Sequence, residues 1–171
     1  FIRALPFDSR QTPFLKAHST AVAGYHDNPR GDDRFYNNLF VQHADLSVYD
    51  NTPLPMTMKG NVFLDGAKSS GHEKDPLVLP NFDPKTKLQA KPSGLILQIN
   101  FAKAWSEAGQ HQLVTTALLG KASIPDLPYE QPDGAPIRID TDYLGKARSE
   151  TNPTPGPFER PGQGLLNIKV W

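Results

Sequence analysis

Few side chains in this sequence combine the residue types and the spacing that catalysis requires. Cleavage of a glycosidic bond needs two carboxyl groups, about 5–5.5 Å apart for retention of configuration and about 6.5–9.5 Å apart for inversion. Asp32 and Asp33 are adjacent, and adjacent side chains on a strand point to opposite faces, so a regular strand presents only one of them to a substrate. The run 28–33 (NPRGDD) also has the composition of a turn. A turn and a single groove-lining carboxylate are therefore the two interpretations of this pair.

His18 is the second candidate, because two hydroxyl residues, Ser19 and Thr20, follow it. A nucleophilic serine needs an aligned base and an acid that orients that base, and adjacency in the sequence provides neither. A neutral histidine that hydrogen-bonds a ligand hydroxyl fits these residues better than a triad, and a surface or structural histidine is the alternative. Rings that could stack on a flat ligand or fill a core are Tyr25, Tyr36, Trp105 and Trp171.

Composition excludes several classes of function. The chain has 171 residues, and 18 Lys and Arg balance 18 Asp and Glu, so no excess of positive charge favours nucleic acid or an anionic membrane. No apolar run approaches the ~18 residues of a membrane span. Cysteine is absent, the histidines are widely spaced, and no Gly-Lys-Ser/Thr phosphate motif occurs. We therefore expect neither a metal nor a cofactor.

One internal match indicates the fold. Residues 35–41 (FYNNLFV) and 58–64 (MKGNVFL) align at an offset of 23, which places Asn38 on Asn61 and Phe40 on Phe63. A period in the low twenties, with Asn before a short apolar strand, suits one coil of a parallel β-helix. In such a coil the asparagines stack at a bend and the apolar side chains fill the interior. Two unrelated strands that share this pattern by chance are the alternative.

The chain divides into three segments that differ in composition and hydrophobic pattern. Residues 1–68 hold the two coils, and residues 69–94 are charged and rich in proline, which favours an excursion or linker. Residues 95–171 have the pattern of a loop-rich, mostly antiparallel β cap. Strands are expected there at 95–101, 111–117, 137–140 and 165–171, with a helical turn at 102–110. The predicted fold class is all-β: the last coils of a parallel β-helix followed by this cap.

Two observations predict that the chain is a fragment. A solenoid needs about three repeats for stability, and only two coils are recognisable. The sequence also opens on residues 1–5 (FIRAL), with neither an initiator Met nor the pattern of a signal peptide. We expect earlier coils on another stretch of polypeptide.

An ordered set of short motifs resembles glycoside hydrolase family 120, the β-xylosidases built on a right-handed parallel β-helix. The matching segments are 16–24 (KAHSTAVAG), 31–40 (GDDRFYNNLF), 61–67 (NVFLDGA), 75–77 (DPL), 82–84 (FDP), 139–144 (IDTDYL) and 168–171 (IKVW). Each motif is short, and the set gains its specificity from its order over almost the whole chain.

The resemblance implies a retaining exo-hydrolase that releases xylose from the non-reducing ends of xylo-oligosaccharides. Members of the family use an Asp nucleophile and a Glu acid/base on coils that precede the matched region, and no position here corresponds to either. The expected partner is therefore an N-terminal polypeptide of the same enzyme that carries this pair.

A homo-oligomer is compatible with the sequence, and a cytoplasmic location is slightly favoured. The alternative function is a non-catalytic carbohydrate-binding or structural β-module, for which the missing pair would be natural.

Three residues are predicted to contact or support the substrate. His18 is expected to hydrogen-bond a sugar hydroxyl, and Asp33 and Arg34 are expected to contact the sugar or to support the site, since all three fall within the matching motifs. A retaining enzyme benefits from hydrogen bonds to sugar hydroxyls that strengthen in the transition state. The competing interpretation is that His18 fixes a loop and that Asp33 and Arg34 pair with each other or with a turn.

Overall fold

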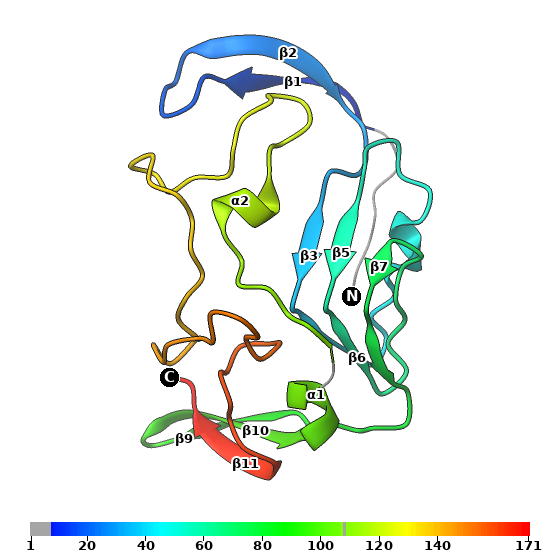
Figure 1. The fold of residues 1–171 in the computed structure, drawn as a ribbon, viewed down its shortest axis with the longest axis vertical. Helices are drawn as coiled ribbons and strands as arrows, with labels where there is room; N and C mark the ends of the chain where they lie inside the picture. Colours follow the sequence, from blue (N-terminus) through cyan, green and yellow to red (C-terminus); the bar gives the residue numbers. More distant parts are fainter. Residues whose placement is uncertain (1–7, 108) are drawn as a thin grey trace.

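Strands dominate the regular structure in the part of the chain that the computed structural model describes, residues 8–107 and 109–171. They form four small sheets, two parallel and two antiparallel. Figure 1 shows a hairpin at one end, the parallel strands along one side, a loop-rich segment (residues 109–163) along the other, and an antiparallel sheet at the far end. The all-β prediction is confirmed. Residues 1–5, on which part of the fragment prediction rests, lie outside the described residues.

The two parallel sheets lie side by side, with three strands each. One contains β3 (Arg34–Tyr36), β5 (Thr57–Lys59) and β7 (Glu73–Lys74), and the other contains β4 (Leu39–Val41), β6 (Val62–Leu64) and β8 (Leu77–Leu79). Leu39 to Val41 pair with Val62 to Leu64, which confirms the offset of 23 residues. The Phe40 and Phe63 rings stack at 5.2 Å with an interplanar angle of 16°.

Each layer of this part of the structure consists of one strand from each parallel sheet: β3 with β4, β5 with β6, and β7 with β8. The third layer, β7 with β8, was not predicted. It lies within residues 69–94, where the sequence indicated an excursion, and Val62 pairs with Leu77 at the shorter separation of 15 residues. At an offset of 15 residues, Pro76 takes the position that corresponds to Asn61. The pattern of Asn before a short apolar strand is therefore lost, and the repeat cannot be recognised in the sequence. Whether residues 1–68, 69–94 and 95–171 are separate units stays a prediction.

Asn61 joins the three layers at the corner between the sheets. Its side chain is fully buried, and its Oδ1 accepts hydrogen bonds from Asn38 N (2.8 Å) and Asn38 Nδ2 (3.0 Å). Its Nδ2 donates to Phe35 O (2.8 Å) and Glu73 Oε2 (2.6 Å). Burial raises the pKa of Glu73, although the hydrogen bonds from Asn61 oppose this. One amide thus satisfies polar groups that the strand ladders leave unpaired where the chain bends, and this outcome confirms the predicted stacking of the two asparagines.

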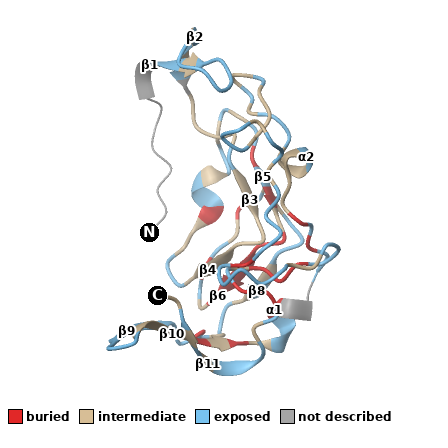
Figure 2. Cartoon of the chain, turned by 90° about the vertical axis from the view of Figure 1, so that its left-hand side faces the viewer, coloured by how far each residue is buried: buried red, intermediate tan, exposed pale blue. Residues whose placement is uncertain are grey.

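Two apolar clusters flank this corner. The first packs Val62 and Leu64 against Ile99, Phe101, Trp105 and Phe158, and the second packs Phe63 with Leu46, Met56, Met58 and Ala67. Figure 2 shows the buried residues gathered around β5, β6 and β10. Leu46 belongs to the 3₁₀ turn η1 (Leu46–Tyr49), which Asp45 caps by accepting a hydrogen bond from Ser47 N (3.0 Å).

An antiparallel sheet covers the first cluster. Its order is β11 (Gly164–Lys169), β10 (Gly94–Phe101) and β9 (Lys87–Lys91). The predicted strands at 95–101 and 165–171 correspond to β10 and β11, and the alternation along β10 buries Ile99 and Phe101. The helical turn predicted around Trp105 is α1 (Lys103–Glu107), and residue 108 lies outside the described residues.

Two local predictions differ from the structure, and one element was not predicted. Residues 111–117 do not form a strand. Thr115 bridges Arg138 and then caps α2 (Thr116–Leu119) by accepting a hydrogen bond from Leu118 N (3.2 Å). Residues 137–140 are not a strand either, because that bridge is isolated. Residues 8–28 form an antiparallel hairpin, β1 (Asp8–Leu15) and β2 (Val22–Asn28), which the sequence did not reveal. Among the described residues, none of the helices is long and apolar enough to cross a membrane.

Replacement of Asn61 by Ala is expected to lower the free energy of unfolding by about 2–4 kcal/mol, since several partners lose their hydrogen bonds inside the protein. Urea denaturation followed by far-UV circular dichroism measures the change. Asn81→Ala is the matched control, because Asn81 is exposed. An equal effect of the two substitutions would contradict the role given to Asn61.

Candidate functional site

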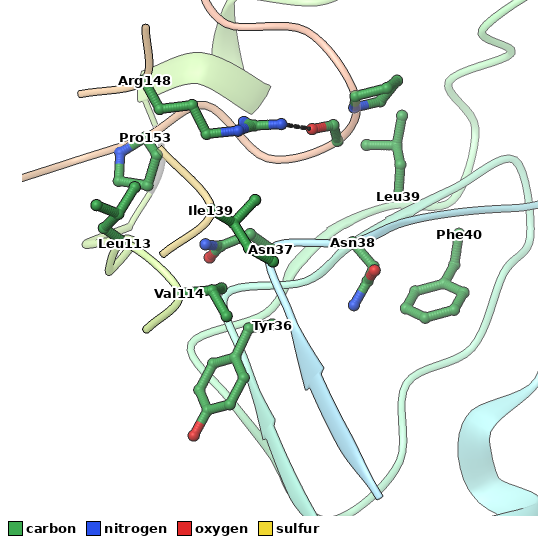
Figure 3. Close-up of a pocket in the computed structure, with 12 residues that line it drawn as sticks. Tyr36, Asn37, Asn38, Leu39, Phe40, Leu113, Val114, Ile139, Arg148 and Pro153 are labelled. Atoms are coloured by element: carbon green, nitrogen blue, oxygen red, sulfur yellow. Dashed lines mark hydrogen bonds between the residues drawn. The ribbon is translucent and has the colours of Figure 1, made fainter. Parts of the chain in front are cut away.

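A pocket of about 470 Å³ lies beside the edge strands β3 and β4. Figure 3 shows Tyr36, Asn37 and Asn38 on one side of it and Leu113, Val114 and Ile139 facing them from the loop-rich segment. Its remaining lining residues are Leu39, Phe40, Arg148, Pro153, Gly156 and Pro157. The walls are mostly apolar, with a few amide, hydroxyl and guanidinium groups, which is the usual make-up of a binding pocket.

The fold produces this pocket because β3 and β4 are edge strands on the same side of the two parallel sheets, opposite β7 and β8. Asn37 turns the chain between them with φ of +55°, and its carbonyl oxygen accepts a hydrogen bond from Gly156 N at 2.7 Å. Arg148 holds the opposite wall in place by donating to Thr154 O (2.9 Å) and Gly156 O (2.9 Å). The loop at 153–157 is thereby fixed next to the edges of both strands that pair with no other strand in residues 8–107 and 109–171.

The polar groups of the pocket suit binding rather than acid–base chemistry. Tyr36 Oη lies 3.4 Å from Leu118 O, and burial raises the pKa of Tyr36, so this group remains a neutral phenol. Asn37 Nδ2 donates to Gln112 O at 2.8 Å. None of the described residues that line the pocket carries a carboxylate or an imidazole. The pocket can therefore accept a polar or extended ligand and has no group for proton transfer at neutral pH.

Arg34, a predicted site residue, clamps the loop-rich segment onto β3. Its Nε donates to Leu119 O (2.7 Å) and its Nη2 to Lys121 O (2.5 Å). Its guanidinium also lies 4.9 Å from the centre of the Tyr129 ring, in the arrangement of a cation–π contact. The planar fork of arginine suits two carbonyl groups at once, which a lysine cannot match.

Asp32, not Asp33, is the partner of Arg34. Asp32 Oδ1 accepts from Arg34 Nη1 (2.7 Å) and Ser123 Oγ (2.8 Å), and Asp32 Oδ2 accepts from Ser123 N (2.7 Å). Burial raises the pKa of Asp32, but the hydrogen bonds from Ser123 and Arg34 outweigh it and hold that pKa below its ordinary value. With φ of +64°, Asp32 also has the backbone of a turn, as the alternative interpretation of 28–33 predicted.

Asp33 differs from its neighbour in being exposed. Within the described part of the chain, no hydrogen bond or ion pair involves its carboxylate, although its backbone oxygen accepts from Thr57 N at 3.1 Å. Partial desolvation raises the pKa of Asp33, and the neighbouring Asp32 carboxylate raises it further. Asp33 is therefore the predicted site residue whose polar atoms remain available to a ligand.

His18 lies in the turn of the β1–β2 hairpin and contacts a distant segment. Its Nε2 is 2.8 Å from Glu130 Oε2, and its Nδ1 is 3.2 Å from Pro132 O. The hydrogen bond to Glu130 raises the pKa of His18, and the Pro132 carbonyl adds to this. The structure thus brings His18 to Glu130, and Arg34 to Tyr129, the residue just before Glu130. None of the three predicted site residues lines the pocket.

Five of the lining residues, at 36–40, fall in the repeat at 35–41, and Tyr36 is also one of the aromatic candidates. The repeat indicates strands and a core, and it does not indicate a pocket. Leu113, Val114 and Arg148 stand in irregular segments without periodicity, so no local signal pointed to them. In the range that the structure describes, no group of three or more His, Cys, Asp or Glu side chains could hold a metal ion.

Comparison with known proteins gives one structural relative. No family model and no curated protein matches this chain. Among solved structures, the chain is similar to XylC, whose structure was determined in complex with xylose, with a TM-score of 0.85 and 29% sequence identity. The similarity covers 95% of this chain and 30% of the XylC chain. The chain therefore has the fold of one part of XylC and spans less than a third of its length.

Removal of the Arg34 side chain is expected to destabilise the protein by about 2–4 kcal/mol, because Asp32 and two carbonyl groups lose their partner. In Arg34→Ala, limited proteolysis should cut residues 119–130 faster than in the wild type. Arg30→Ala serves as the control, since the Arg30 guanidinium makes one hydrogen bond to the described residues, a long one of 3.4 Å to Asn51 O. Wild-type stability and wild-type cleavage of Arg34→Ala would show that the clamp is dispensable.

Proposed function

We propose that this chain forms the C-terminal part of a retaining β-xylosidase of glycoside hydrolase family 120, acting on xylo-oligosaccharides. The observation that carries the proposal is the similarity to XylC in complex with xylose, which extends over 95% of this chain at 29% identity. The ordered motifs from residue 16 to Trp171 support the same assignment. XylC is much longer than this chain, so the reaction itself belongs to the whole enzyme in this proposal.

In the proposed architecture, β3 to β8 are the last coils of a right-handed parallel β-helix. Support comes from the in-register pairing of three layers and from the Asn61 hydrogen bonds between them. Within residues 1–68, β3 to β6 supply the first two layers. Residues 69–94 contain the third layer together with the proline-rich excursion, and residues 95–171 cap the coils.

The proposed partner is an N-terminal polypeptide of the same enzyme that supplies the catalytic Asp and Glu. The outer edges of β3 and β4 support this role, because no strand of the described residues pairs with them and an open edge can accept a further strand through main-chain hydrogen bonds. Leu39 and Phe40 remain half-buried there, beside the 470 Å³ pocket. A preceding coil would cover these side chains and fill the pocket with its own.

Asp33 is the proposed sugar contact, since its carboxylate is exposed and unused by the rest of the described chain. Arg34 supports it by fixing the adjoining backbone and the segment at 119–121. A direct contact of His18 with a sugar hydroxyl stays part of the proposal. It requires the sugar to replace Glu130 or Pro132 as the partner of one imidazole nitrogen.

The test is an assay of the enzyme that carries this chain on xylobiose, with the released anomer identified by ¹H NMR. Release of β-xylose as the first product is expected from a retaining enzyme. Asp33→Asn should lower kcat and kcat/KM together by about 10–100-fold, the usual worth of a charged hydrogen bond made mainly in the transition state. Asp75→Asn is the control, because Asp75 is also exposed and has a left-handed backbone that Asn tolerates.

The other outcomes separate the competing functions. Binding of xylo-oligosaccharides without turnover, with a single polypeptide by intact mass, would favour the non-catalytic carbohydrate-binding module. α-Xylose as the first product would exclude retention. Neither binding nor turnover would overturn the proposed function, and unchanged kinetics of Asp33→Asn would remove Asp33 from the site.

A further inference from the structure

The β1–β2 hairpin stands at one end of the molecule, above the loop-rich segment (Figure 1). Its two strands form a sheet of their own, and two-stranded hairpins are at best marginally stable alone. Several of its large apolar side chains are exposed: Leu15 (44%), Val22 (49%) and Tyr25 (66%). Apolar packing therefore contributes little to holding this hairpin in place, and specific polar contacts become important.

One such contact joins the turn of the hairpin to the turn at 130–134. It consists of His18 Nε2 with Glu130 Oε2 at 2.8 Å and His18 Nδ1 with Pro132 O at 3.2 Å. The turn on the far side is closed by hydrogen bonds of its own, since Gln131 N donates to Ala135 O (2.8 Å) and Gly134 N donates to Gln131 O (2.9 Å). Tyr129, just before it, lies under the Arg34 guanidinium.

The geometry selects one protonation state of His18. Both ring nitrogens face oxygen atoms that accept hydrogen bonds, a carboxylate on one side and a carbonyl on the other. A neutral imidazole carries a proton on only one nitrogen, whereas the imidazolium ion donates from both. The charged groups that face His18 across this contact are Glu130 and Asp133, both acidic. Loss of the proton therefore leaves one lone pair directed at an acceptor and removes the ion pair.

We propose that His18, Glu130 and Pro132 form a pH-dependent latch, which ties the β1–β2 hairpin to the turn at 130–134 while His18 is protonated and releases it when His18 loses its proton. This inference does not depend on the proposed function. The sign follows from linkage, because the closed latch raises the pKa of His18 above its ordinary value of 6.5. The latch is fully effective below that ordinary value and is lost as the pH rises through the raised pKa.

Two measurements on the full chain test the latch. NMR titration of the His18 Cε1–H signal gives its pKa, which should exceed 6.5 in the wild type and fall towards 6.5 in Glu130→Gln. The absence of cysteine allows spin labels at Thr20→Cys and Val78→Cys, both exposed and outside the latch. Double electron–electron resonance should then show one narrow distance at acid pH and an added, broader population at alkaline pH. Glu130→Gln should remove this pH dependence.

Linkage bounds the size of the effect. The ratio of open to closed hairpin can change by at most tenfold for each pH unit that separates the His18 pKa of the wild type from that of Glu130→Gln. Glu150→Gln, which removes an exposed carboxylate paired with Arg138, should behave like the wild type. A wild-type His18 pKa at or below 6.5, or identical distance distributions at acid and alkaline pH, would overturn the proposal.

Discussion

The amide of Asn61 is the interaction on which the parallel part of the structure depends. The chain must turn sharply where it passes from one parallel sheet to the other, and a turn of this kind leaves backbone groups without ladder partners in a place that water does not reach. Asn61 supplies two donors and one acceptor there, and it bonds to Phe35 in the layer before and Glu73 in the layer after. A one-residue slip of any strand would separate these partners, so the amide fixes the register as well as satisfying the corner.

Arginine side chains have the corresponding role in the loop-rich half. That half has few ladder hydrogen bonds, and its carbonyl groups need other partners. Arg34 bonds to carbonyls at 119 and 121, and Arg148 bonds to carbonyls at 154 and 156. One guanidinium can donate hydrogen bonds to several carbonyl groups in a fixed geometry. Each arginine therefore holds a loop in place through hydrogen bonds that a neighbouring strand would otherwise provide. The pocket beside β3 and β4 owes its far wall to Arg148.

Features of the fold that local sequence patterns encode are predictable from the sequence. The repeat of Asn-apolar-Phe-apolar revealed the pairing of β4 with β6, and the alternation from Leu95 to Phe101 revealed β10. Such patterns could not reveal β7 and β8, where Pro76 interrupts the pattern, nor α2, where the capping Thr115 prevails over β-branched neighbours. The surroundings of the predicted site residues were also hidden, because Arg34 binds backbone carbonyls and His18 meets Glu130 across 112 residues of chain.

The pairing of β11 with β10 determines when this chain can fold during its synthesis. The strand at 94–101 leaves the ribosome long before its neighbour at 164–169, and Leu166, Ile168 and Val170 complete the cluster around Val62 and Leu64. For about 60 residues of translation, roughly 3–12 s at usual rates, an apolar strand has one edge that only the late segment can pair. The nascent chain therefore passes through a state that is prone to aggregation, and the charged strand β9 on the other edge of β10 is its early protection.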